Sequence, residues 1–116
     1  MWAVRRAVVT SGQTAIGTSA SHKWQVASGT VTIEVSFSCA AGVSCTSLII
    51  GVEGSITGSY YFALASHTFT STELANKACM FHIVDKPIVW IRSNITTLTQ
   101  TGVGDVSITV DLLSYD

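Results

Sequence analysis

The stretch TVTIEVSFS, from Thr30 to Ser38, decides the fold class. Every second residue in it is apolar, and the residues between them carry hydroxyl or carboxyl groups. Successive side chains of a β-strand point to opposite faces, so this alternation predicts a half-buried strand. The same pattern returns over residues 106–112. The apolar faces of the two strands comprise Val31, Ile33, Val35, Phe37, Val106, Ile108, Val110 and Leu112.

Weaker strand patterns cover residues 2–10, 47–53, 60–65, 79–84 and 88–95. In the first, Arg5 and Arg6 are adjacent and must point to opposite faces. The run 47–53 is almost continuously apolar, which suits a central strand covered on both sides. Gly54 and Gly58 bracket a hairpin loop of about four or five residues. We expect 97–105, TLTQTGVGD, to be a loop, and 12–21 to be a loop or an irregular edge strand.

One segment, Thr70–Ala78, predicts a short helix. Thr70 and Glu73 have the spacing of a capping box, in which each side chain accepts a hydrogen bond from the other residue's backbone. Leu74, Ala75 and Ala78 would form a short apolar stripe. Because this helix has one or two turns at most, it does not change the fold class.

About seven to nine short strands, with turn signals roughly every 8 to 12 residues, are typical of a sandwich or barrel. We therefore predict an all-β, antiparallel sandwich of jelly-roll type. The 116 residues suffice for one two-layer core and not for two, so we expect a single domain over 1–116. Residues 1–10 would be an edge strand or an arm exchanged with a neighbour.

The composition favours contact with other proteins. Charged residues make up 11% of the chain, against roughly 25% in an average soluble domain, and Ser and Thr supply about a quarter. A surface poor in Lys and Glu desolvates at little cost when it meets another protein, which favours a homo-oligomer or a member of a protein lattice. Six Lys and Arg and a net charge of −1 argue against nucleic-acid binding. There is neither an apolar run of the ~20 residues that a membrane span requires nor a signal peptide, so we expect no membrane contact and no secretion.

We find no pattern that predicts catalysis, a cofactor or a metal. His22, His67 and His82 are scattered, and no ligand pair has the local spacing of a metal motif. The GxSxG nucleophile elbow is absent, and Glu34 and Asp111 each fall on the polar face of a strand, where a solvated carboxylate is the default. We therefore expect a protein that is not an enzyme. Cys39 and Cys45 could form a disulfide, although reduced, partly buried thiols are the favoured interpretation.

Trp90 and Arg92 are the best candidates for a contact with a partner. In PIVWIRSNI they share one strand face, opposite Ile91 and Ser93. Trp and Arg are enriched at interface hot spots. The alternative is that Trp90 belongs to the core and Arg92 covers it. Tyr60 and Tyr61, beside the glycine-flanked loop, form a second candidate contact with a protein or a glycan.

Residues 51–110 resemble small virion-associated proteins of tailed bacteriophages. The resemblance is carried by GVEGSITGSYYFALASHTFTSTEL, MFHIVDKPIVWIRSNITTLTQTG and DVSITVDLL. It implies a β-sandwich used as a capsid decoration, head fibre or tail component, often built as a trimer or larger ring. It covers about half of the chain and carries over no functional residues.

The function that we predict is therefore that of a structural virion protein. It would be made in the host cytoplasm, associate with itself, with a trimer favoured, and bind other virion proteins. The alternative is a carbohydrate-binding, lectin-like module that stacks sugars on Trp90, Tyr60 or Tyr61. A small hydrolase is the third hypothesis, and its low prior follows from the absence of catalytic motifs.

Overall fold

Alternating apolar and polar residues build strands along most of the chain. The computed structural model describes residues 4–26, 30–84 and 86–115, which form nine strands and one short helix. In chain order these are β1 Val4–Gln13, β2 Gly17–Thr18, β3 His22–Val26, β4 Thr30–Cys39, β5 Ser44–Ser55, β6 Phe62–Thr68, α1 Ser71–Asn76, β7 Ala78–Val84, β8 Ile88–Thr101 and β9 Val106–Tyr115.

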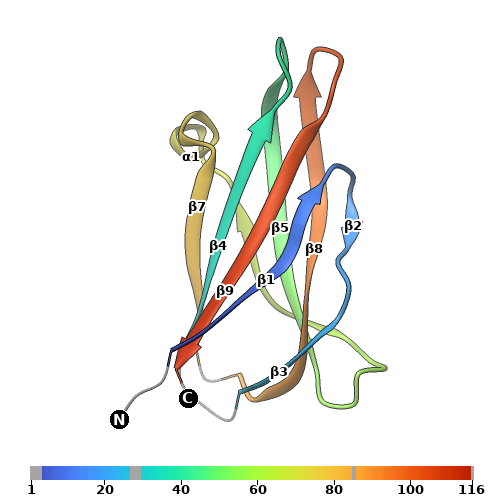
Figure 1. Ribbon diagram of the computed structural model, residues 1–116, viewed down its shortest axis with the longest axis vertical. Helices are drawn as coiled ribbons and strands as arrows, with labels where there is room; N and C mark the ends of the chain where they lie inside the picture. The colour runs from blue at the N-terminus through green and yellow to red at the C-terminus, as the bar shows by residue number, and fades with distance from the viewer. Residues whose placement is uncertain (1–3, 27–29, 85, 116) are drawn as a thin grey trace.

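The strands form two antiparallel sheets (Figure 1). One has the order β1-β9-β4-β7 and the other the order β2-β8-β5-β6, with β3 also paired to β8. The strands pair from the two ends of the chain inward: β1 with β9, then β2 and β3 with β8, then β4 with β7, and finally β5 with β6. The chain is therefore one long antiparallel hairpin wrapped into two sheets, which is a jelly roll. The predicted fold class is confirmed.

The core lies between the two sheets and is built from every second residue. Burial in β4 alternates along the strand, as the sequence predicted. Truncating such a buried aliphatic side chain to alanine costs about 2–5 kcal/mol, because the packed surroundings relax only partly. The four central strands β4, β5, β8 and β9 supply most of the core: Val31, Ile33, Val35, Phe37, Leu48, Ile50, Val52, Ile91, Ile95, Val106, Ile108, Val110 and Leu112.

β1 lies at the edge of its sheet, next to β9. Its two arginines point to opposite faces, as predicted. The guanidinium of Arg5 lies 4.4 Å from the centre of the Trp24 ring, whereas Arg6 pairs with Asp111 at 3.5 Å on the outer face. Trp2, which we assigned to this strand, lies outside the described residues. Exchange of residues 1–10 with a neighbour stays a prediction.

The helix α1 has the predicted capping box and is shorter than predicted. The Glu73 N–H donates to Thr70 Oγ1 at 3.2 Å, and the Thr70 N–H donates to Glu73 Oε1 at 2.9 Å. The prediction that the helix reaches Ala78 is wrong, because Lys77 adopts a left-handed conformation with φ 61° and β7 starts at Ala78. Of the expected apolar stripe, Leu74 is partly buried and packs against the core, whereas Ala75 is exposed and no residue of α1 is fully buried. No helix within the described ranges is long and apolar enough to cross a membrane.

The run 47–53 lies within β5, between β8 and β6, but it is not covered on both sides. Leu48, Ile50 and Val52 are buried, whereas the alternate side chains Ile49 and Glu53 are only half-buried. The second face of this sheet is the outside of the sandwich, where neighbouring side chains of the same sheet give partial cover.

Two further strand boundaries differ from the prediction, and one strand was not predicted. Residues 60–61 belong to the β5–β6 loop, which spans 56–61, because Gly58 turns with φ +84° and donates its N–H to Ser55 Oγ at 2.9 Å. Most of the expected loop 97–105 belongs to β8, whose β-branched threonines pair with β5 and leave 102–105 as the turn. β3, over His22–Val26, was not predicted from the sequence.

Candidate interaction surfaces

Trp90 and Arg92 point outward from β8, on the outer face of the five-stranded sheet. The neighbouring residues Ile91 and Ser93 are each 1% exposed and point into the core. The alternation in this strand therefore separates the faces as predicted. Tyr61 joins the outward pair from the β5–β6 loop, since its ring centre lies 3.9 Å from the guanidinium of Arg92.

Arg92 is held tightly within its own sheet. Glu53 lies directly opposite it on β5, and Arg92 Nε donates to Glu53 Oε1 at 2.7 Å. Asn94 Nδ2 donates to the second oxygen of the same carboxylate at 3.2 Å. The side chains of Arg92 and Glu53 are 27% and 18% exposed. A partner that engaged Arg92 would have to share it with Glu53 and the face of Tyr61.

Trp90 is half-buried beneath the β5–β6 loop. A Cβ atom added to Gly58 would lie 3.0 Å from Trp90 Nε1, which shows how closely the loop backbone approaches the indole. The hydroxyl of Tyr61 donates to Ser21 Oγ at 2.6 Å, which anchors the loop on its other side. The structure thus brings Trp90, Arg92 and Tyr61 together as a packed polar and aromatic cluster. Their role as a contact site stays a prediction.

Tyr60 lies apart from this cluster, in an apolar patch at one end of the molecule. Ile56, Tyr60 and Phe62 are 75%, 73% and 70% exposed. We call these three residues the apolar end. They border a concavity of about 370 Å³. Its lining comes from the end of β5, the β5–β6 loop, the start of β6 and the segment that leads into β8: Gly54, Ser55, Ile56, Thr57, Tyr60, Phe62, Leu64, Pro87 and Ile88.

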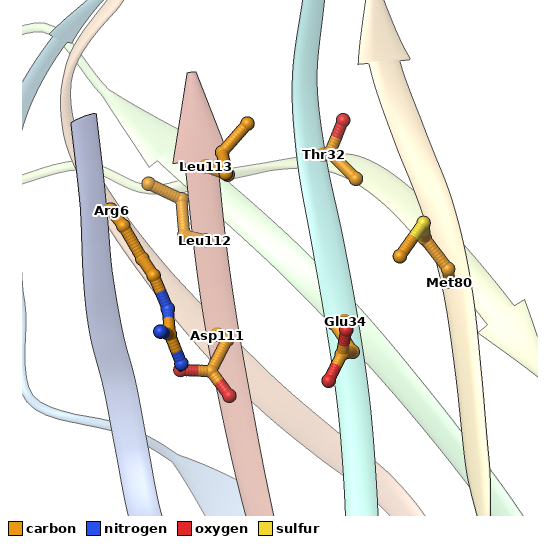
Figure 2. A pocket seen from close by; sticks show the side chains of 7 residues that line it. All are labelled: Arg6, Thr32, Glu34, Met80, Asp111, Leu112 and Leu113. Atoms are coloured by element: carbon orange, nitrogen blue, oxygen red, sulfur yellow. The ribbon is translucent and has the colours of Figure 1, made fainter. Parts of the chain in front are cut away.

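A second concavity, of about 240 Å³, lies on the outer face of the four-stranded sheet (Figure 2). Figure 2 shows Arg6 reaching Asp111 from β1, with Glu34 on the next strand and Met80 beyond it. Glu34 and Asp111 are directly opposite in register, an arrangement of like charges that the Arg6 guanidinium offsets. Arg6 is 71% exposed, so this ion pair contributes little to stability. The groove combines both charges with an exposed methionine.

Comparisons with known proteins match the fold of the chain and not its sequence. No protein-family model matches, and no curated protein matches. Among solved structures, the SPBc2 prophage-derived protein YomS aligns with a TM-score of 0.56 at 12% identity, over 98% of this chain and 96% of that one.

The VP2 subviral particle of infectious bursal disease virus aligns with a TM-score of 0.53 at 12% identity, over 98% of this chain. The alignment covers 32% of the VP2 chain, so the protein spans about a third of that relative's length. At these identities the two likenesses show the shared fold alone.

The three thiols of the chain are free in the structure. Burial raises the pKa of the Cys45 thiol, and it raises the pKa of Cys79 to about 12, with a further contribution from the Glu73 carboxylate. A thiol with a raised pKa is protonated at neutral pH and is a poor nucleophile. The favoured interpretation of reduced, partly buried thiols agrees with this arrangement.

Sequence reasoning missed Ile56 and Phe62, the two apolar residues that extend the patch around Tyr60. Ile56 stands isolated in the loop GSITGS, and Phe62 follows two tyrosines. Three consecutive aromatic residues cannot all point into a core from one strand, because successive side chains alternate. That run was a signal that at least one large aromatic side chain is exposed. Pro87 and Ile88 line the same concavity as this run, and their position beside it could be found only from the fold.

Proposed function

We propose that the protein is a non-enzymatic structural subunit of a bacteriophage particle, placed at the capsid, the head or the tail, that associates with itself and with the particle surface. One observation carries this proposal: the likeness to a prophage-derived protein extends over 98% of this chain and 96% of that one. The jelly roll is thus shared without large insertions on either side. A segment of a viral subviral-particle protein with the same fold supports the proposal.

Self-association is assigned to the apolar end. Exposed, contiguous apolar side chains rimmed by polar residues are the usual mark of a protein contact. Ile56 and Phe62 project from the same patch that contains the concavity, so the patch offers both a protrusion and a hollow. In a closed trimer, each copy can place its protrusion in the hollow of the next, which is the head-to-tail contact that a ring requires. The low charge of the chain leaves little repulsion to oppose the contact.

The test is the oligomeric state of the purified protein, measured by size-exclusion chromatography with light scattering. We expect wild type to be an oligomer, a trimer in the favoured case, and the double variant Ile56→Ser with Phe62→Ser to be a monomer. The matched control is Ile16→Ser with Val103→Ser, which removes two exposed apolar side chains away from the apolar end. A wild-type monomer, or equal dissociation of both double variants, would contradict the proposed contact.

The carbohydrate-binding alternative retains one specific observation. Of the three predicted stacking platforms, Tyr60 is open to solvent, whereas Arg92 covers a face of Tyr61 and the Gly58 backbone lies against Trp90. A sugar needs an exposed ring face for stacking. A glycan array run on the same sample separates the alternatives. Selective glycan binding by a strict monomer, lost in Tyr60→Ala, would favour the lectin-like module over the virion subunit.

A further inference from the structure

The chain brings a histidine, a carboxylate and a thiol together where the two sheets meet at one side. β6 and β7 are edge strands of different sheets, and α1 connects them beside β7 (Figure 1). His67 comes from β6, Glu73 from α1 and Cys79 from β7. One ligand atom of each lies within 4.8 Å of the other two.

Two of these side chains are fixed before any ligand arrives. His67 Nε2 lies 2.9 Å from Glu73 Oε1, and the Thr70 N–H donates to the same oxygen at 2.9 Å. Both bonds end on Glu73 Oε1. The capping box therefore positions the carboxylate as well as starting the helix.

The aromatic surroundings fix the imidazole and lower the polarity around it. The ring of His67 stacks on Phe81 with centroids 5.4 Å apart and planes 8° from parallel. Phe69 meets the same ring edge-on at 5.9 Å. Cys79 is 7% exposed and approaches from the core side. Metal sites commonly combine such a rigid, apolar shell with a few polar ligands.

We propose that His67, Glu73 and Cys79 bind a zinc ion. Imidazole nitrogen, carboxylate oxygen and thiolate sulfur are the ligands of zinc in proteins, and the sulfur argues against magnesium and calcium, which take oxygen ligands. Three protein ligands leave a fourth, tetrahedral position. The side chains of His67 and Glu73 are 26% and 24% exposed, so that position faces solvent and takes water.

The required rearrangement is small. Zinc bonds of about 2.0–2.3 Å place tetrahedral ligand atoms about 3.3–3.8 Å apart. Zinc binding replaces the 2.9 Å hydrogen bond between His67 Nε2 and Glu73 Oε1, because the imidazole nitrogen that binds the ion carries no proton. The two atoms separate slightly, and the sulfur moves inward from within 4.8 Å. Side-chain rotation about Cys79 and Glu73 supplies this change without moving the strands.

The same three residue types also occur in cysteine nucleophile relays, but this thiol is unsuited to that chemistry. A nucleophile must be within reach of its substrate. Cys79 packs against the core and is 7% exposed, which leaves little of it open to a substrate. Metal binding needs only the side of the sulfur that faces the His67 and Glu73 ligand atoms.

This inference departs from our expectation, based on the sequence, that the chain has no metal site. That expectation rested on the absence of ligand pairs at close spacing. Here the ligands stand at positions 67, 73 and 79, on three successive elements, and only the strand–helix–strand path brings them together. The bound ion would tie the edges of the two sheets to each other, so it would stabilise the folded state by mass action.

Cobalt titration of the chelator-treated full chain tests the site, because Co²⁺ takes the same geometry and reports its ligands by colour. We expect one Co²⁺ per chain, a thiolate-to-cobalt charge-transfer band, and visible bands of tetrahedral intensity that vanish when zinc is added. Zinc should also raise the melting temperature of the wild type.

Five variants resolve the ligands. Cys79→Ser should abolish the charge-transfer band. His67→Gln and Glu73→Gln should each weaken cobalt affinity by about tenfold or more, the loss expected even for an outer-shell partner. Cys45→Ser and His82→Gln remove a thiol and an imidazole outside the cluster and should bind as wild type does. Zinc should raise the melting temperature of these two controls and not that of the ligand variants.

A wild type without the charge-transfer band would overturn the proposal, and so would ligand variants that bind like the controls. Circular dichroism shows whether each variant is folded. If Cys79→Ser does not fold, the two variants of partly exposed side chains, His67→Gln and Glu73→Gln, decide the question. The outcome is independent of the oligomeric state and therefore of the virion role.

Discussion

Two buried serines show how much one hydroxyl can matter inside the sandwich. Ser114 in β9 is 2% exposed, and its Oγ accepts a hydrogen bond from Trp24 Nε1 at 3.1 Å. Ser93 in β8 is 1% exposed, and its Oγ has no hydrogen-bond partner among the described residues. Burying an unsatisfied hydroxyl costs about 1–3 kcal/mol. The first serine therefore stabilises the fold and the second weakens it.

The two alanine substitutions should act in opposite directions. Ser93→Ala is expected to raise the free energy of unfolding by about 1 kcal/mol, because it removes an unpaired polar group. Ser114→Ala should lower it by about 1–3 kcal/mol, because the buried Trp24 N–H loses its acceptor. Urea denaturation followed by circular dichroism measures both. Equal destabilisation by the two changes would show that Ser93 does have a partner.

At the scale of single residues, the sequence predicted to which face of a strand a side chain points, but not which residues it contacts. Alternation placed Trp90 and Arg92 on one face, which the structure shows. The hydrogen bond of Arg92 with Glu53 could not be predicted, because it depends on the register between strands that are 39 residues apart. The same applies to the face of Tyr61 that Arg92 covers.

Among the elements, those with strict alternation were predicted best. β4 and β9 match their predicted ranges to within a few residues, because one face of each is fully buried and fixes the register. β8 was predicted too short, since its Thr-rich second half lacks apolar alternation and is stabilised by pairing with β5. β3 was missed because the polar residues His22, Lys23 and Gln25 break the apolar alternation. This short strand forms through its pairing with β8.

α1 depends on a local signal that sequence alone revealed. The Thr70 backbone N–H, followed by the hydrogen bond with His67, holds the pKa of the Glu73 carboxyl below its ordinary value. A carboxyl group with a lowered pKa in the folded state stabilises that state when ionised. This contribution is fully present above the ordinary pKa of glutamate and is lost as the pH falls through the lowered pKa.

The difference in free energy of unfolding between wild type and Glu73→Gln should therefore shrink as the pH falls. We expect wild type to unfold at the higher urea concentration at neutral pH, and the two midpoints to converge once the pH falls below the lowered pKa of Glu73, with chelator present throughout. Glu34→Gln, which removes an exposed carboxylate without a capping role, is the control. A difference that stays constant with pH would show that the Glu73 charge does not contribute.

Over the whole molecule, two loops close the end of the sandwich opposite the apolar end. The β4–β5 and β8–β9 loops lie together at the upper end of Figure 1, and each passes from one sheet to the other. The Ala40 N–H donates to the Asp105 carbonyl at 2.9 Å. A Cβ atom on Gly102 would lie 2.2 Å from the Gly42 carbonyl oxygen, so only glycine permits this contact.

Two glycine substitutions separate this contact from backbone strain. Gly42 has φ +76° with open space around its Cβ position, whereas Gly102 combines φ +89° with the close approach. Gly42→Ala should destabilise the protein by about 1 kcal/mol through its dihedral angle alone. Gly102→Ala should cost about 1–3 kcal/mol more, because the loops must separate. Thermal unfolding compares them, and similar losses would exclude a structural role for the loop contact.

The sequence predicted the architecture and left the surfaces to be found. Period-two burial fixes two sheets around one core, since every slip would expose an apolar face. Sheet order, the apolar end and the cluster of His67, Glu73 and Cys79 arise where segments remote in sequence lie side by side. Those juxtapositions follow from the rolled path of the chain, which no local pattern contains.

That path also constrains how the protein is made. β9 lies between β1 and β4 in its sheet, yet the ribosome synthesises it after every other described strand. Until then β1 and β4 each have a row of backbone donors and acceptors without its native neighbour, and such strand edges recruit other chains. We therefore infer that the four-stranded sheet cannot close until β9 has been synthesised, and that nascent chains without β9 are the state most exposed to misassembly.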